Sequence, residues 1–259
     1  AIRDFGIQDF EHATIREVKA VAAYAEKESG VEFIKLEMGI PGLPASQIGV
    51  DAQVKALQGG IAHSYPDIQG CPELKSEASR FAKAFIGVSV AAEGCVPVCG
   101  SMQGTFAAFL TCSQCDRRKD TVLFIDPGFP VQKMQLQVLG VKYETFDVYD
   151  YRGDKLAPKL ESYLEKGNIC AIVYSNPNNP SWICFNEDEL KAIGTLATKY
   201  DVIVMEDLAY FAMDFRKQLS TPFQPPYQAT VARYTDNYML FISGSKAFSY
   251  AGERIGVVC

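Results

Sequence analysis

Lys246 stands just after an apolar stretch, next to groups that a phosphate-bearing ligand needs. Ser243 and Ser245 precede it by three and one residues, and Arg254 follows it by eight. A lysine amine forms an imine with an aldehyde, while hydroxyl groups and a guanidinium can hold a phosphate. The spacing therefore indicates a lysine that binds an aldehyde cofactor carrying a phosphate. A lone Ser-x-Ser-Lys would more simply be a polar surface loop, so this interpretation depends on three segments upstream.

Asp207 follows the short apolar run 202–206, which is typical of a buried parallel strand. A carboxylate at the C-terminal end of such a strand faces the crevice where α/β proteins bind ligands. Asp207 could pair there with a protonated pyridine nitrogen, or it could simply cap the next element. Tyr210 comes three residues later, so its phenol could lie beside the same ligand.

A second buried-strand run, Cys170–Ser175, leads into Asn-Pro-Asn-Asn-Pro at residues 176–180. Two prolines and three asparagines in five residues predict a tight turn. The turn could be structural only, or its Asn179 amide could donate a hydrogen bond to a ring oxygen. Asn186 and Glu189 then form a capping-box pattern, which predicts the start of a helix.

The third segment runs from the apolar stretch Val96–Cys99 through small residues at 100–105 into the apolar, helical stretch Phe106–Leu110. Small residues between a strand and a helix leave backbone N–H groups free to bind an anion, and the helix dipole adds to the attraction. The loop matches neither Gly-x-Gly-x-x-Gly nor the Walker pattern, so alone it is weak evidence.

In this order, the segments resemble those of the fold type I pyridoxal-phosphate enzymes, and most closely the class I/II aminotransferases. The resemblance extends from about Leu36 to the last residue. Its motifs are specific in combination: Asn-Pro-Asn-Asn-Pro, Asp-x-x-Tyr, Ser-x-Ser-Lys and Gly-x-Arg-x-Gly. It implies pyridoxal 5'-phosphate as the cofactor, an L-amino acid and a 2-oxo acid as substrates, and a homodimer.

The resemblance also implies a role for each matching position. Lys246 would be the Schiff-base lysine and proton shuttle, and Asp207 the partner of the pyridine nitrogen. Asn179 and Tyr210 would donate to the phenolic oxygen of the ring. The remaining implied cofactor contacts are Tyr65 from the neighbouring subunit, Ser101, Met102, Gln103, Phe129 stacked on the ring, Ser243, Ser245 and Arg254. Gly39 and Ile40, together with Asn179, would lie near the substrate.

Two features depart from the family pattern. Ser181 and Trp182 stand where the family usually has Thr-Gly, and a glycine normally allows an unusual backbone angle there. The local turn is therefore expected to differ. The chain also stops at Cys259, before the family's segment that completes a small domain and carries an arginine for the substrate α-carboxylate. We therefore expect an incomplete chain in which no residue is assigned that role.

Helical and strand patterns alternate along the chain, which predicts a three-layer α/β/α fold around a mainly parallel sheet. Residues 1–40 are expected to form an N-terminal arm or part of a smaller domain, and residues 41–259 the large cofactor-binding domain. The irregular, proline-containing stretch Leu219–Ala232 predicts a surface loop. Strands are expected at Thr121–Ile125, Val141–Phe146, Cys170–Ser175, Val202–Glu206, Tyr238–Ser243 and Arg254–Val258. Helices are expected at Ile15–Glu28, Val50–Leu57, Glu73–Phe85, Val131–Leu139, Leu156–Glu165 and Glu187–Lys199.

Composition narrows the possible partners. The chain has 259 residues, with 25 basic against 31 acidic side chains, which argues against nucleic acid. Cys112 and Cys115 lack a second cysteine pair, and His12 and His63 are far apart, so no metal site is predicted. The sequence has neither a membrane-spanning stretch nor the apolar core of a signal peptide, so a cytoplasmic location is expected.

Three alternatives to an aminotransferase stay open. The same fold and cofactor also serve C–S β-lyases, decarboxylases, racemases and acyltransferases. A Ser-x-x-Lys hydrolase fits residues 243–246 formally, but no Lys-Thr-Gly follows in the sequence. A non-catalytic regulatory domain, which would be expected to follow a winged-helix domain, is the third.

Overall fold

The computed structural model describes residues 4–7, 13–36 and 39–259. The chain divides into two compact units, Ala1–Leu43 and Pro44–Cys259. In the first unit, helix α1 (Ile15–Ser29) begins with a capping box between Thr14 and Glu17 and ends at Gly30, which has a φ of 68°. The predicted helix is confirmed, whereas its assignment to an arm or a smaller domain stays a prediction.

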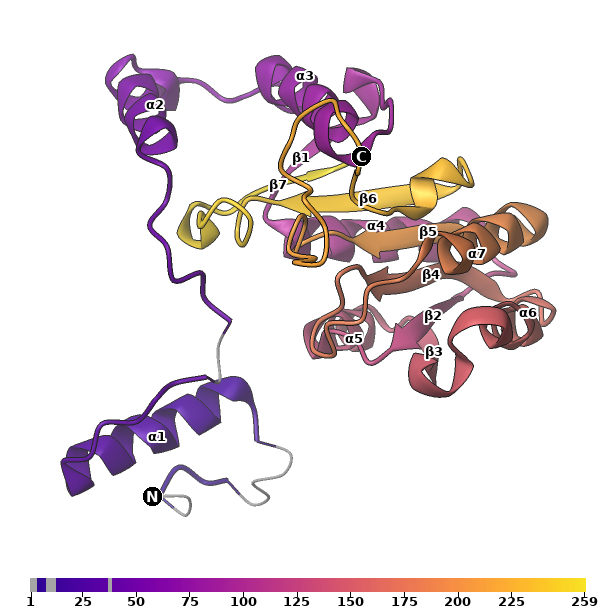
Figure 1. Ribbon diagram of the computed structural model, residues 1–259, viewed down its shortest axis with the longest axis horizontal. Helices are drawn as coiled ribbons and strands as arrows, with labels where there is room; N and C mark the ends of the chain where they lie inside the picture. Colours follow the sequence, from indigo (N-terminus) through magenta and orange to yellow (C-terminus); the bar gives the residue numbers. More distant parts are fainter. Residues whose placement is uncertain (1–3, 8–12, 37–38) are drawn as a thin grey trace. The chain divides into compact units, whose positions relative to one another are not determined.

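The second unit is built on one mainly parallel sheet (Figure 1). Within the described residues the strand order is β1-β7-β6-β5-β4-β2-β3. Strands β2 to β6 pair in parallel with one another, and β7 pairs antiparallel with both β1 and β6. The strands are β1 (Val96–Cys99), β2 (Thr121–Asp126), β3 (Lys142–Asp147), β4 (Ile169–Ser175), β5 (Ile203–Asp207), β6 (Tyr238–Ser243) and β7 (Ile255–Val258).

Helices cover both faces of this sheet. Successive residues of a strand point to opposite sides, so each strand packs against the helices on both faces. On β4, Ile172 and Tyr174 belong to a buried cluster with side chains of α6 and α7, while Ala171 and Val173 belong to another with α4 and α5. The three-layer α/β/α fold is therefore confirmed. The helices of this unit are α2 (Gln47–Gln58), α3 (Pro72–Phe81), α4 (Ser101–Cys115), α5 (Pro130–Leu139), α6 (Leu156–Leu164) and α7 (Glu187–Tyr200).

Local details differ from the sequence pattern at several element boundaries. The single helix predicted for Glu73–Phe85 is α3 followed by a wider helical turn, η3 (Ala82–Ile86). The predicted strand Arg254–Val258 begins one residue later, because Arg254 has a left-handed φ of 57°. The capping box of α7 is confirmed, since Asn186 accepts a hydrogen bond from the backbone of Glu189 and donates one to its side chain.

The strand directions bring polar residues together at one edge of the sheet. Strands β4, β5 and β6 run in parallel and end there with Ser175, Asp207 and Ser243. Strand β1 ends at the same edge with Cys99, because β1 and β6 are both antiparallel to β7. Strand β7 begins there with Ile255. This edge is the one at which α/β sheets bind ligands.

Candidate active site

Lys246 lies three residues beyond the end of β6, in a half-buried position. Its ammonium group is 5.9 Å from the centre of the Tyr210 ring. Burial lowers the pKa of the Lys246 amine, because a charged ammonium loses water contacts there. Burial of the Tyr210 side chain is the main cause that raises its pKa, and the nearby charge of Asp207 adds to the effect. Lys246 and Tyr210, which are predicted to act together, are thus side by side.

Asp207 is buried at the end of β5 and accepts two hydrogen bonds. The backbone N–H of Ala209 donates to Oδ1 at 3.0 Å, and the Gln132 amide donates to Oδ2 at 3.1 Å. Burial raises the pKa of Asp207 to about 6 despite these two bonds, since they favour the charged form. A cationic partner would stabilise this carboxylate further, which suits a protonated pyridine nitrogen.

Gln132 contacts Asp207, and this contact could not be predicted from the sequence. It is buried on the first turn of α5, and its backbone N–H donates to the carbonyl of Phe129 at 3.2 Å. Phe129, the predicted stacking residue, is therefore one helical turn from the side chain that holds Asp207. The role of Phe129 stays a prediction. Nothing in the sequence distinguishes Gln132 from the other polar residues of α5.

The turn at residues 176–180 is fixed to the elements around it. The Asn176 N–H donates to the Asp207 carbonyl at 3.0 Å, and the Asn178 amide donates to the Pro127 carbonyl at 2.7 Å. The backbone N–H of Asn179 donates to Ser175 Oγ at 3.0 Å. The turn that carries Asn179 is therefore held against both the end of β5 and the loop before α5.

A candidate anion site lies where α4 begins. The N-cap residue Gly100 provides no side-chain cap, and Ser101 Oγ is buried without a hydrogen-bond partner. A Cβ atom on Gly100 would collide with the Arg254 guanidinium, and one on Gly256 would lie 3.1 Å from the backbone of Gly100 and Ser101. The start of α4 therefore brings together the first N–H groups of a helix, the Ser101 hydroxyl on that helix and a guanidinium that approaches Gly100. This combination is typical of phosphate binding.

The loop after β6 borders the same region. Ser243 Oγ donates to Ser245 Oγ at 2.9 Å and accepts from the Ser245 N–H at 3.1 Å. The Gly244 N–H donates to the Ile255 carbonyl at 3.0 Å, so this loop is tied to the residue that follows Arg254. The Ser-x-Ser-Lys and Gly-x-Arg-x-Gly motifs are therefore adjacent in space.

The sequence of the chain is similar to sequences of known proteins. The sequence pattern of the family described as aminotransferase class I and II matches residues 31–259. The chain belongs to that family. The probable aspartate aminotransferase of Methanocaldococcus jannaschii is 25% identical over 87% of this chain and 56% of its own length. The putative aminotransferase AatC of Rhizobium meliloti is 29% identical over 89% of this chain and 55% of its own length.

Solved structures of aminotransferases share the fold. An aminotransferase from Mycobacterium tuberculosis matches with a TM-score of 0.78 at 23% identity, covering 100% of this chain and 62% of that one. The aspartate aminotransferase of Thermus thermophilus with maleate matches with a TM-score of 0.75 at 21% identity, covering 100% of this chain and 64% of that one. The chain spans little more than half the length of the curated relatives it matches. Members of the class I/II family depend on pyridoxal phosphate.

The other residues predicted from the family pattern lie in different parts of the chain. Tyr65 is 100% exposed, and its predicted contact is with another subunit. Gly39 and Ile40 are exposed and belong to the first unit of the chain. The Gln103 side chain accepts a hydrogen bond from the Cys99 N–H at 2.6 Å, so it secures the end of β1. The predicted roles of these residues, and of Met102, stay predictions.

The described residues contain no group of three histidine, cysteine or acidic side chains that could hold a metal ion. All eight cysteines are free thiols. His12 lies outside the described residues. In the part of the chain that the structure covers, no helix is both long and apolar enough to span a bilayer.

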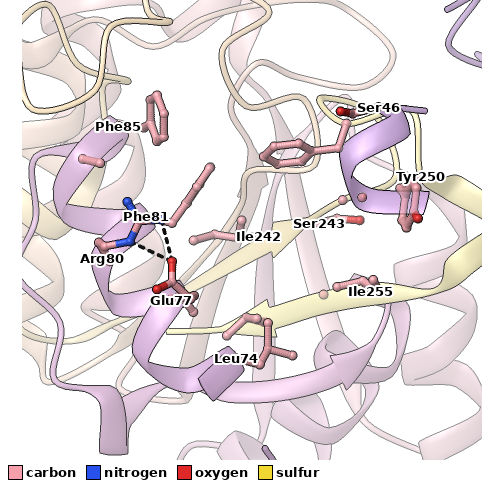
Figure 2. Close-up of a pocket in the computed structure, with 17 residues that line it drawn as sticks. Ser46, Leu74, Glu77, Arg80, Phe81, Phe85, Ile242, Ser243, Tyr250 and Ile255 are labelled. Carbon is pink, nitrogen blue, oxygen red and sulfur yellow. Dashed lines mark hydrogen bonds and ion pairs between the residues drawn. The ribbon is translucent and has the colours of Figure 1, made fainter. Parts of the chain in front are cut away.

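An apolar cavity of about 350 Å³ borders Ser243 and Gly256 on the side toward α3 (Figure 2). Phe81, Ile242 and other apolar side chains line it, and the Arg80 guanidinium at its wall is paired with Glu77 at 2.6 Å. Lys246 and Asp207 are not among its lining residues. The cavity therefore adjoins the polar site at Ser243 and Gly256 but does not include Lys246 or Asp207.

Replacing Gly100 with alanine should weaken the binding of pyridoxal phosphate by at least about tenfold, or roughly 1.4 kcal/mol. The added Cβ would displace the Arg254 guanidinium, in addition to the cost of a side chain at a φ of 77°. Gly140→Ala is the matched control, because Gly140 has a φ of 69° and open space around it. Titration of both variants with the cofactor, followed by absorbance, measures the difference. Equal affinities would contradict an anion site at Gly100.

Proposed function

We propose that the chain forms the cofactor-binding part of a pyridoxal-phosphate-dependent aminotransferase that moves an amino group between an L-amino acid and a 2-oxo acid. The observation that carries this proposal is the Lys246 amine, whose pKa is lowered by burial, on the same sheet edge as Asp207 and the anion site at Gly100 and Arg254. Membership of the class I/II family supports it.

The residues present fit the cofactor. Its phosphate suits the start of α4, where Ser101 Oγ is buried without a partner and the Arg254 guanidinium approaches Gly100. Asp207 offers a buried carboxylate for a cationic nitrogen, and Asn179 and Tyr210 lie on the two loops that follow β4 and β5. When bound, pyridoxal phosphate supplies an aldehyde and a conjugated ring that accepts the electron pair of the substrate's α-carbon.

Lys246 has two tasks in this proposal. Its amine would hold the cofactor through the aldehyde group, and it would take and return the proton at the substrate's α-carbon. Both tasks need the neutral amine. The lowered pKa of Lys246 raises the fraction of neutral amine near neutral pH, as a general base requires.

Asp207 and its neighbours keep the ring in its reactive form. The Asp207 carboxylate would hold a proton on the pyridine nitrogen, and the bond from Gln132 at 3.1 Å fixes the direction in which Oδ2 points. Tyr210 and Asn179 would donate to the phenolic oxygen of the ring. These groups are in place before the substrate arrives, so they stabilise the developing charge at low reorganisation cost.

The test is an analysis of products. An aminotransferase given one amino acid and one 2-oxo acid yields the exchanged pair in equal amounts. Release of pyruvate with ammonia, or of CO₂, would assign the site to a lyase or a decarboxylase on the same fold. Conversion of an L-amino acid into its D-form would assign it to a racemase.

We also propose a homodimer in which Tyr65 serves the site of the neighbouring subunit, since the Tyr65 side chain is fully exposed in the single chain. Mixing a Lys246→Ala parent with a Tyr65→Ala parent should raise activity above that of either one. A hybrid dimer then has one site with both defects and one with neither. If hybrids form and activity does not rise, each site is built from one chain.

A further inference from the structure

The turn that carries Asn179 presents a large aromatic side chain from a strained backbone position. Trp182 has a φ of 60°, in the left-handed region that glycine favours. The Trp182 N–H donates to the Asn178 carbonyl at 3.0 Å, and the Asn178 N–H donates to the Ile183 carbonyl at 2.8 Å. These bonds close the turn and hold Trp182 in place, at a cost of about 1–2 kcal/mol relative to a right-handed residue.

The Trp182 indole lies beside the predicted catalytic groups. Its ring contacts the Tyr210 ring edge to face, with centres 5.4 Å apart, and the Tyr210 ring lies 5.9 Å from the Lys246 ammonium. On its other side Trp182 stacks with Phe215 at 6.4 Å and an angle of 18° between planes. Trp182 is 42% exposed and Phe215 is 86% exposed, so both rings remain accessible to a ligand.

An ion pair lies next to Phe215. Arg216, next to Phe215, donates to Asp214 through Nε at 2.8 Å and through Nη2 at 2.9 Å. This paired geometry satisfies the carboxylate and removes the net charge of the guanidinium. An acidic substrate side chain at this place would have to compete with Asp214, whereas an aromatic or aliphatic one gains contact with two rings.

We propose that Trp182 and Phe215 form the wall that receives the substrate's side chain, and that this wall selects amino acids with aromatic or large apolar side chains. This inference rests on the proposed aminotransferase function. The substrate's α-carbon must approach Lys246, so a side chain extending past Tyr210 meets the indole of Trp182. Exposed aromatic rings grouped at one place are typical of a binding surface.

The first experiment compares amino donors. Single-turnover rates with L-phenylalanine and L-alanine are measured for the cofactor-loaded protein and for Trp182→Gly. The ratio of the two rate constants should fall by about tenfold in the variant, because an apolar contact of this size is worth about that factor. Glycine suits the φ of 60°, so this change also removes backbone strain.

Phe223→Gly is the matched control. Phe223 is likewise an exposed aromatic residue with a left-handed φ, of 61°, but its N–H donates to the Ala84 carbonyl on η3. The donor ratio of Phe223→Gly should equal that of the unmodified protein. A ratio unchanged in Trp182→Gly, or lowered equally in both variants, would overturn the proposal.

A second experiment needs no reaction. Trp182 is the single tryptophan of the chain, so intrinsic emission reports on this wall. Titration with 3-phenylpropionate, which has no amino group, should change the emission at a concentration about tenfold below that needed for propionate. In Phe215→Ala this difference should shrink. Equal responses to both acids would overturn the proposal.

The two proposals fail in different ways. If borohydride does not fix the cofactor to Lys246, the proposed function is wrong. If Lys246 is labelled but the donor ratio and the emission do not depend on Trp182 and Phe215, only the proposed selectivity is wrong.

Discussion

Replacing Lys246 with alanine should lower the rate of amino-group transfer by at least about 10⁴-fold. The change removes both the amine that binds the aldehyde and the base that moves the α-proton, and positioned base catalysis alone contributes 10²–10⁴-fold. The side chain is half-buried but packs in no hydrophobic cluster, so the fold should persist. Rates in a single turnover with L-amino acids measure the effect, and circular dichroism checks the fold.

Lys199→Ala is the control for Lys246, since Lys199 is an exposed residue on α7 whose ammonium pairs with Glu161 at 2.6 Å. Its activity should be unchanged. Treatment of the loaded protein with borohydride should bleach the visible band and leave the reduced adduct on the peptide containing Lys246. An adduct on another lysine would show that the assignment is wrong.

Replacing Asp207 with asparagine should slow exchange of the substrate's α-proton roughly 10²–10³-fold, the range found when one preorganised electrostatic contact is removed. A neutral amide cannot hold a proton on the ring nitrogen, so the ring becomes a poor electron acceptor. Exchange in D₂O, followed by NMR, measures this step directly. Asp201→Asn is the control, because Asp201 is exposed and has a left-handed φ of 51° that asparagine tolerates. Exchange at the unmodified rate in Asp207→Asn would refute this role.

The pH dependence of cofactor binding should identify the same carboxylate. Burial raises the pKa of Asp207 to about 6, so its charge is present above pH 6 and is lost as the pH falls through that value. Affinity for pyridoxal phosphate should therefore fall below pH 6 in the unmodified protein by more than it does in Asp207→Asn. Other groups that titrate in this range affect both proteins and cancel in the comparison.

Much of the fold follows from the sequence pattern. The central strand β4 is an almost continuous apolar run, because a central strand is covered on both faces, and the prediction for 170–175 differs from the observed Ile169–Ser175 by one residue. The boundaries of β5 and β7 each shift by one residue. In β7 the shift arises from the left-handed φ of Arg254, which depends on contacts that no local pattern encodes.

The site could be predicted only where residues follow strand ends. Asp207 and Ser243 occupy such positions, and their placement at one edge follows from the strand directions. Gln132 could not be found in this way, because its contact with Asp207 depends on how α5 packs against the sheet. Glu206 is a second residue whose environment could not be predicted from the sequence. It is buried on the opposite face from Asp207, and burial raises its pKa to about 7.

The position of β7 has a consequence for how the chain folds. Strand β7 lies between β1 and β6, and Val258 pairs with Val96, about 160 residues earlier in the chain. Pairing over such a separation costs loop-closure entropy and is therefore slow. Arg254 and Gly256 reach Gly100 and Ser101 only when β7 enters the sheet. The candidate anion site therefore depends on this long-range pairing, and a bound phosphate would favour the entry of β7 into the sheet.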